Sequence, residues 1–196
     1  MTYIMDGHED LTETCLESSR VYEGRIVNVR VDRVTLPGGR VARREVVEHK
    51  PAVVVLAENE GEEVLLIRQY RYPAAQALIE LPAGIAEPGE DFADSAVREL
   101  REETGWKPSK IERVAEFFSS PGFSDEMLTF FYATGLSRDD LPQDEDELVL
   151  ARFASRAEVE DLVRRGEVKD CKTLFGLYWW LSALGSRGRP HGHGAG

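Results

Sequence analysis

The sequence has very few cysteines, with only Cys15 and Cys171 among its 196 residues. They stand far apart, the first in a polar stretch and the second at the start of a predicted helix. Two such cysteines do not indicate the disulfide framework that stabilises small secreted domains. We therefore expect a reducing compartment and a cytoplasmic protein.

Long hydrophobic runs are also missing. The longest unbroken apolar stretches are of the size of Ala52–Ala57, whereas a helix needs about 20 apolar residues to span a bilayer. Residues 1–19 contain five acids and no Lys or Arg, the opposite of the basic start of a signal peptide. The sequence thus predicts no membrane partner.

Basic residues are in the minority, because 24 Lys and Arg face 36 Asp and Glu, for a net charge of -12. Most of such a surface repels a phosphate backbone, so we expect no nucleic-acid partner. A strongly acidic protein that handles phosphates needs a cation in between. Hydrophobic residues still make up 42%, enough for the core of one domain with an appendage.

Several common catalytic patterns are absent. The sequence has neither the GxxxxGK[ST] phosphate loop nor the HExxH zinc motif. No serine or cysteine has a recognisable partner for nucleophilic catalysis. The four histidines do not cluster with the acids that are discussed below; they are His8, His49, His191 and His193.

Strand patterns dominate the first two thirds of the sequence, with one helix inserted and two helices after them. Residues 1–49 are predicted as a loose polar leader (1–19) and a β-hairpin (22–49), residues 50–185 as the main domain, and residues 186–196 as a disordered tail. In the main domain, strands are expected at 52–57, 63–69, 111–119, 127–134 and 147–153, and helices at 92–104, 155–165 and 170–184. A further segment at 78–83 is short and ends at Pro82. This order indicates a mixed α/β fold of the α+β type.

The helix pattern at 92–104 carries an acidic row beside its apolar stripe. Glu99, Glu102 and Glu103 share one face because they are three or four positions apart. Glu99 and Glu103 fall at the edge of the stripe, where partly buried like charges repel. A hard divalent cation such as Mg²⁺ would offset that cost, and Arg98 can pair with Glu102. A solvated acidic face is the alternative.

The spacing of these residues resembles the Nudix box, a motif of 23 residues. The positions that match it are Gly84, Glu90, Arg98, Glu99, Leu100, Glu102, Glu103, Gly105 and Trp106. The resemblance implies hydrolysis of a nucleoside diphosphate linked to another moiety, with Mg²⁺ or Mn²⁺ as the cofactor. It also implies the Nudix fold, a mixed β-sheet sandwiched between helices, here with a small N-terminal antiparallel sheet.

Three further segments are similar to the ADP-ribose pyrophosphatase subfamily. They are residues 68–73 (RQYRYP), 80–90 (ELPAGIAEPGE) and 120–126 (SPGFSDE). This similarity implies that ADP-ribose is cleaved to AMP and ribose 5-phosphate. It also implies a homodimer in which the leading hairpin exchanges between subunits.

The resemblance also implies roles for individual residues. Metal ligands would be Glu99, Glu102, Glu103 and the carbonyl of Ala83, with Arg98 orienting the carboxylates. Substrate contacts would be Arg71, Glu87, Phe123 and Glu126, among which Phe123 has core packing as its alternative. The acid that positions or deprotonates the attacking water would be Glu145 or Glu147, unless the acidic run 139–147 is only a solvated loop.

The Nudix box does not indicate which base or sugar the substrate contains, so it does not distinguish ADP-ribose from other substrates. GDP-mannose or another ADP-sugar is the nearest rival. A non-catalytic Nudix-fold ligand sensor is a different class, and it usually has a degraded box or an attached DNA-binding domain. The intact box and the acidic charge argue against that reading.

Overall fold

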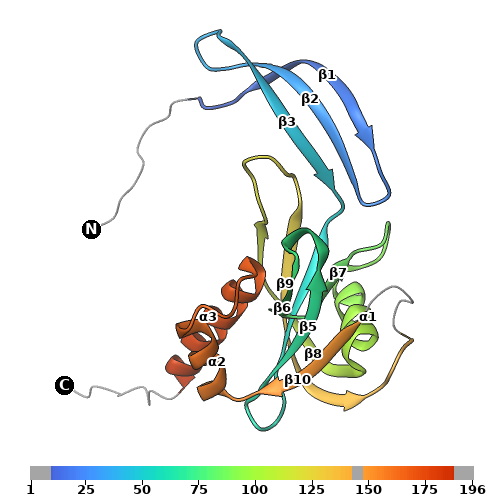
Figure 1. Cartoon of the computed structure of the whole chain (residues 1–196), viewed down its shortest axis with the longest axis vertical. Helices are drawn as coiled ribbons and strands as arrows, with labels where there is room; N and C mark the ends of the chain where they lie inside the picture. Colours follow the sequence, from blue (N-terminus) through green and yellow to red (C-terminus); the bar gives the residue numbers. More distant parts are fainter. Residues whose placement is uncertain (1–9, 143–147, 188–196) are drawn as a thin grey trace, which may run out of the picture. The chain divides into compact units, whose positions relative to one another are not determined.

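The computed structural model describes residues 10–142 and 148–187 (Figure 1). Its contacts divide the chain into two compact units. The first unit contains the chain up to Lys50 together with Ser120–Glu126, and the second contains Pro51–Ser119 and the chain from Met127 onward. Each unit is described by itself.

The first unit is built on a three-stranded antiparallel sheet in the order β1-β2-β3. Its strands are β1 (Thr14–Glu23), β2 (Val27–Thr35) and β3 (Val41–His49). The prediction of a loose leader over residues 1–19 is therefore wrong for residues 14–19, which belong to β1 and pair with β2. Every residue of β1 is exposed, so neither face selects for apolar side chains and the strand leaves little period-two signal in the sequence.

The segment Ser120–Glu126 belongs to this first unit because it runs beside β3. The amide of Val47 donates to the carbonyl of Phe123 at 2.7 Å. The amide of His49 donates to the carboxylate of Asp125 at 2.8 Å. A segment far away in sequence thus extends the edge of the N-terminal sheet.

The second unit contains two sheets and three α-helices. The four-stranded sheet has the order β7-β4-β9-β8, and the three-stranded sheet has the order β10-β5-β6. The strands are β4 (Ala52–Ala57), β5 (Val64–Arg71), β6 (Gln76–Glu80), β7 (Ala83–Ile85), β8 (Trp106–Phe118), β9 (Met127–Arg138) and β10 (Val149–Ala154). The helices are α1 (Phe92–Thr104), α2 (Arg156–Arg164) and α3 (Cys171–Arg187), with a 3₁₀ turn η1 (Tyr72–Ala74) after β5.

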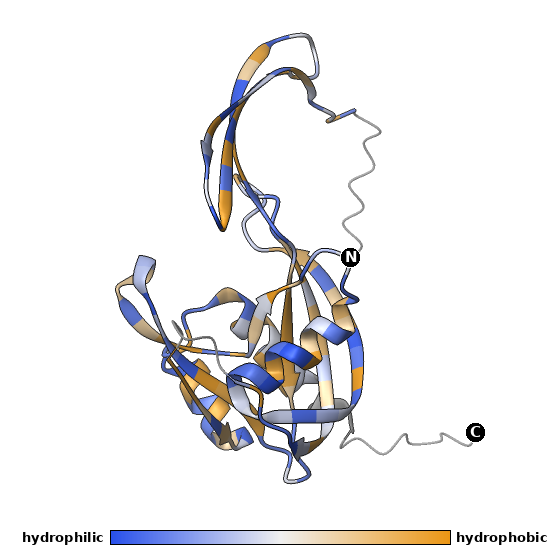
Figure 2. Ribbon diagram, turned by 90° about the vertical axis from the view of Figure 1, so that its right-hand side faces the viewer, coloured by the Kyte–Doolittle hydropathy of each residue, from blue (hydrophilic) through white to orange (hydrophobic). Residues whose placement is uncertain are grey.

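Strand β4 lies at the centre of this unit and is buried on both faces. Val54 and Leu56 join a core cluster that includes residues of α2 and α3. Val53 and Val55 point the other way, into a cluster with Leu100 of α1. The sheets are thus sandwiched between α1 and the α2–α3 pair, as predicted (Figure 1). Figure 2 shows hydrophobic colour along the central strands and hydrophilic colour over much of α1.

The element boundaries differ from the predictions in one place that matters for the site. Residues 78–83 were expected to form one short segment, but the chain forms β6 and then β7, which belong to different sheets. Pro82 lies between them, and its carbonyl accepts a hydrogen bond from the amide of Val55. Because proline has no amide proton, it suits a break between two ladders.

Two other features of the described residues bear on the sequence analysis. Cys15 and Cys171 are both free and exposed. No helix within the described part of the chain is long and apolar enough to cross a membrane. Helix α3 continues to Arg187, two residues into the segment predicted as a tail, and the rest of that segment lies outside the described residues.

Candidate active site

Helix α1 presents the acidic row because its two ends and its apolar stripe fix its rotation. The carboxylate of Asp91 caps the start by accepting from the amide of Ala93 at 2.8 Å. Gly105 ends the helix in the left-handed region, with φ of 72°, a conformation that favours glycine. Ala96 and Leu100 are fully buried against the sheet. The glutamates that follow in the sequence therefore lie at the border of the core.

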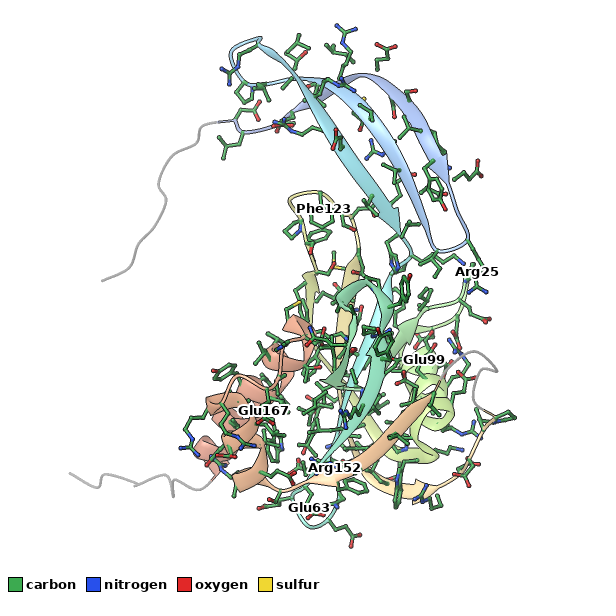
Figure 3. All side chains as sticks on the ribbon, in the orientation of Figure 1. Arg25, Glu63, Glu99, Phe123, Arg152 and Glu167 are labelled. Carbon is green, nitrogen blue, oxygen red and sulfur yellow. The ribbon has the colours of Figure 1, made fainter. Side chains whose placement is uncertain are left out.

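Glu99 fills the space in front of Gly84 on β7. A Cβ atom at Gly84 would lie 2.0 Å from Cδ of Glu99 and 2.1 Å from its Oε2. Any side chain at that position would displace the carboxylate. Figure 3 labels Glu99 on helix α1, and its side chain is only 14% exposed. The first position of the box must therefore be glycine, because a side chain there would collide with Glu99, fifteen residues later.

Glu103 is held against the residue that precedes Gly84. Its Oε2 accepts a hydrogen bond of 3.0 Å from the amide of Ala83. The residue is 5% exposed. The structure thus brings the predicted ligands Ala83 and Glu103 together, through the amide rather than the carbonyl of Ala83.

Arg98 gathers three carboxylates with one guanidinium. Its Nη1 donates to Glu99 at 2.7 Å and to Glu102 at 2.9 Å. Its Nε and Nη2 each donate to Glu90 at 3.1 Å, and Nη2 also donates to the carbonyl of Ile85 at 3.2 Å. A planar guanidinium fixes the directions of its acceptors. The orienting role of Arg98 in catalysis stays a prediction.

The same contacts change the ionisation of Glu90. Hydrogen bonds from Arg98 are the main cause that lowers the pKa of Glu90 to about 2. The hydroxyl of Ser95 contributes by donating to the same carboxylate at 2.6 Å. In turn, the hydrogen bond to Glu90 is the main cause that raises the pKa of Arg98. Glu90 is therefore held in its charged form at neutral pH.

Arg71, the predicted phosphate ligand, stands at the end of β5 beside a buried acid. Its Nε and Nη2 each donate to a carboxylate oxygen of Glu80 at 2.8 Å. Glu80 is 1% exposed and also accepts from Lys172. The hydrogen bonds to Glu80 are the main cause that raises the pKa of Arg71, and the charge of Glu103 contributes.

A cavity of about 370 Å³ opens at the carboxyl end of α1. Its lining residues are Glu102, Glu103, Thr104, Gly105, Trp106, Arg138, Asp140, Leu141, Val149 and Ala151. The guanidinium carbon of Arg138 lies 4.4 Å from the centre of the Trp106 ring, a cation–π distance. Two predicted acids therefore border a space that is large enough for a small polar ligand.

The remaining predicted residues lie outside helix α1. Glu87 is exposed, and its backbone forms the turn before α1 with Glu90. Phe123 (58% exposed) and Glu126 belong to the first unit, where Glu126 lies 3.3 Å from a ring nitrogen of His49. Substrate contact by these three stays a prediction. Glu145 and Glu147 lie outside the described residues.

The donor set suits a hard divalent cation. Glu99, Glu102 and Glu103 supply oxygen ligands on one helix, and the absence of a side chain at Gly84 is needed for Glu99 to approach β7. Carboxylate oxygens are the ligands that Mg²⁺ and Mn²⁺ prefer. Among the described residues, however, no three Asp, Glu, His or Cys side chains form a ready metal cluster. Glu99 and Glu102 accept hydrogen bonds from Arg98 instead.

Sequence reasoning missed the partners of Arg71. Glu80 was noted only as part of a family segment, and Lys172 was not noted at all. The two are 92 positions apart, so no local spacing relates them. A charged residue inside a predicted buried strand was the one signal that could have singled out Glu80.

Comparison with known proteins agrees with this geometry. The model of the NUDIX domain matches residues 48–170, and the model described as nucleoside diphosphate sugar hydrolase N-terminal domain matches residues 13–47. A protein named ADP-ribose pyrophosphatase from Bacillus subtilis is 34% identical over 87% of this chain and 94% of its own length.

One further relative and one solved structure are also similar to this chain. One named methanol dehydrogenase activator, from Bacillus methanolicus, is 35% identical over 85% of this chain and 91% of its own length. A crystal structure titled as an ADP compounds hydrolase superposes with a TM-score of 0.83 over 93% of this chain and all of its own, at 21% identity, which supports the fold alone. The chain belongs to the NUDIX domain family.

Proposed function

We propose that this Nudix protein hydrolyses the diphosphate bond of ADP-ribose to AMP and ribose 5-phosphate, with Mg²⁺ or Mn²⁺ as the cofactor. The observation that carries the proposal is the contact of the Glu99 carboxylate with Gly84, beside Glu103 on Ala83. Two acids of the box helix thus lie against the short strand β7. The name of the Bacillus subtilis relative supports the choice of substrate.

In this proposal Glu99, Glu102 and Glu103 hold the cation, and Arg98 orients their carboxylates. A bound divalent cation would neutralise phosphate charge and lower the pKa of a coordinated water. Arg71 supplies a fixed positive charge for a phosphate of the substrate. Its planar guanidinium suits phosphate recognition better than a lysine would.

The proton of the attacking water needs an acceptor. We assign this role to Glu145 or Glu147 on the strength of the sequence resemblance. Glu87, Phe123 and Glu126 complete the proposed substrate contacts. The contribution of Glu87, Phe123 and Glu126 to substrate binding would depend on the base and the sugar. That of the box acids would depend on the diphosphate.

We also propose a homodimer that is formed through the first unit. Among the described residues of that unit, Val34 is the only buried hydrophobic one. Its exposed large hydrophobic residues are Leu11, Leu16, Val21, Tyr22, Ile26, Val41 and Phe123. A sheet without a core of its own is marginal in water and needs another surface. Light scattering at micromolar concentration should give twice the mass of 22.0 kDa, and a monomer would contradict the dimer.

The substrate is tested by a panel of nucleoside diphosphate sugars. ADP-ribose, other ADP-sugars and GDP-mannose are incubated with Mg²⁺, and released mononucleotide is measured by chromatography. The Glu99→Gln variant serves as the matched inactive control. ADP-ribose should have the highest kcat/KM. A preference for GDP-mannose would assign another nucleoside diphosphate sugar as the substrate. The match of the N-terminal domain model supports nucleoside diphosphate sugars as a class.

A further inference from the structure

Glu80 is a charged side chain inside the second unit, with 1% of its surface exposed. Burial by itself raises the pKa of this carboxyl group, but hydrogen bonds from Arg71 and the charge of Lys172 lower it below its usual value. A buried carboxylate is costly to the fold unless it is fully paired. Because burial of the Glu80 carboxylate is costly, we expect this residue to have a function besides packing.

Lys172 is itself fixed at the start of α3. Its side chain is 13% exposed, and its Nζ lies 3.0 Å from the carboxylate of Asp170. That carboxylate caps the helix by accepting from the amide of Thr173 at 2.9 Å. The hydroxyl of Thr173 accepts from the amide of Leu81 at 2.8 Å. The first turn of α3 is therefore tied to the residue that follows Glu80.

Arg71, at the end of β5, also pairs with Glu80. Both oxygens of Glu80 accept from its Nε and Nη2, which fixes the plane of the guanidinium. Among the described residues, its Nη1 makes no hydrogen bond, and the side chain keeps 38% exposure. One edge of a rigid cation thus stays available to a ligand.

We propose that Glu80 and Lys172 are positioning residues for Arg71. Lys172 fixes the carboxylate of Glu80, and Glu80 fixes the guanidinium of Arg71, so that its free edge is presented to a substrate phosphate. This inference rests on the proposed function, in which Arg71 contacts the diphosphate. Without the pair, Arg71 would have to lose side-chain freedom each time a substrate binds.

Steady-state kinetics with ADP-ribose and Mg²⁺ tests the inference. Glu80→Gln and Lys172→Met should each raise KM about tenfold with kcat little changed, because a phosphate contact made equally in the ground and transition states affects KM alone. Lys169→Met is the matched control, since Lys169 is exposed and its one hydrogen bond to a described residue is with Gln76. Its KM should equal that of the wild type.

A double-mutant cycle separates positioning from a general structural effect. In the Arg71→Ala background, Glu80→Gln and Lys172→Met should cause no further rise in KM, because they act through Arg71. Melting temperatures are measured for every variant. If Glu80→Gln fails to fold, Lys172→Met carries the test. Additive effects in the Arg71→Ala background, or a wild-type KM in folded single variants, would overturn the inference.

Binding of ADP with Mg²⁺, measured by calorimetry, distinguishes this failure from that of the proposed function. A wild-type protein that binds ADP but does not cleave ADP-ribose contradicts the function only. In that case Lys172→Met should still weaken ADP binding about tenfold. Absence of ADP binding in the wild type, or equal binding by the wild type and Lys172→Met, contradicts the positioning role.

Discussion

The Glu99 carboxylate occupies the position in which a side chain at Gly84 would begin, since a Cβ there would lie 2.0 Å from its Cδ. The two residues are on different elements, β7 and α1. The contact explains why the box opens with glycine: the strand must present bare backbone to the acid. It also makes Gly84 a sensitive probe of the site.

Replacement of Gly84 by alanine should lower kcat by about 100-fold, because a catalytic group displaced by about 1 Å can lose that much. The kcat for ADP-ribose with Mg²⁺ is the measurement, and the melting temperature monitors the fold. Gly61→Ala is the matched control, since a Cβ there would lie 3.2 Å from the nearest atom, in the side chain of Asn59. Unchanged kcat in Gly84→Ala would mean that Glu99 has no catalytic role.

Removal of divalent metal should abolish hydrolysis, and Mg²⁺ or Mn²⁺ should restore it. Glu103→Gln should lower kcat at least about 100-fold, although Gln can still accept the hydrogen bond from Ala83. Its melting temperature without metal should equal or exceed that of the wild type, because one of two neighbouring like charges is gone. Full activity in excess chelator would refute the metal assignment, and unfolding of Glu103→Gln would indicate a structural role instead.

Glu90 should stabilise the fold at neutral pH but not in strong acid. Its pKa in the folded state is lowered from 4.5 to about 2 by Arg98. Its contribution is therefore complete above the unfolded value and is lost as the pH falls from 4.5 toward 2. The melting temperature of Glu90→Gln should be below that of the wild type at pH 7, and the difference should shrink between those two pH values. A difference that is independent of pH would contradict the assignment.

The acidic loop should contain the base. Glu145→Gln and Glu147→Gln should differ in severity, and the worse of the two should lower kcat with little change in KM, because a base acts in the transition state. The double variant should be worse than either single one. Metal affinity, measured by Mn²⁺ titration, should stay near that of the wild type. If the double variant keeps wild-type kcat, Glu102 becomes the first alternative.

Local rules in the sequence were sufficient for the box helix. The spacing of apolar residues gave its bounds at 92–104, and the glycine that follows it ends the helix as expected. The acids fell at the border of the stripe because a helix turns by a fixed angle per residue. Strand β1 was not predicted because all of its residues are exposed. An exposed strand does not need apolar residues at every second position.

The sequence by itself determined which residues share the helix face, the family to which the box belongs, and the chemistry that such a set of carboxylates supports. Only the tertiary structure decided what stands opposite each of them. Glu99 on α1 lies against Gly84 on β7. Lys172 donates a hydrogen bond to Glu80, although the two are 92 positions apart in the sequence. Periodicity is set by bonds between neighbours in the chain, whereas these contacts depend on how separate elements pack, which no local pattern encodes.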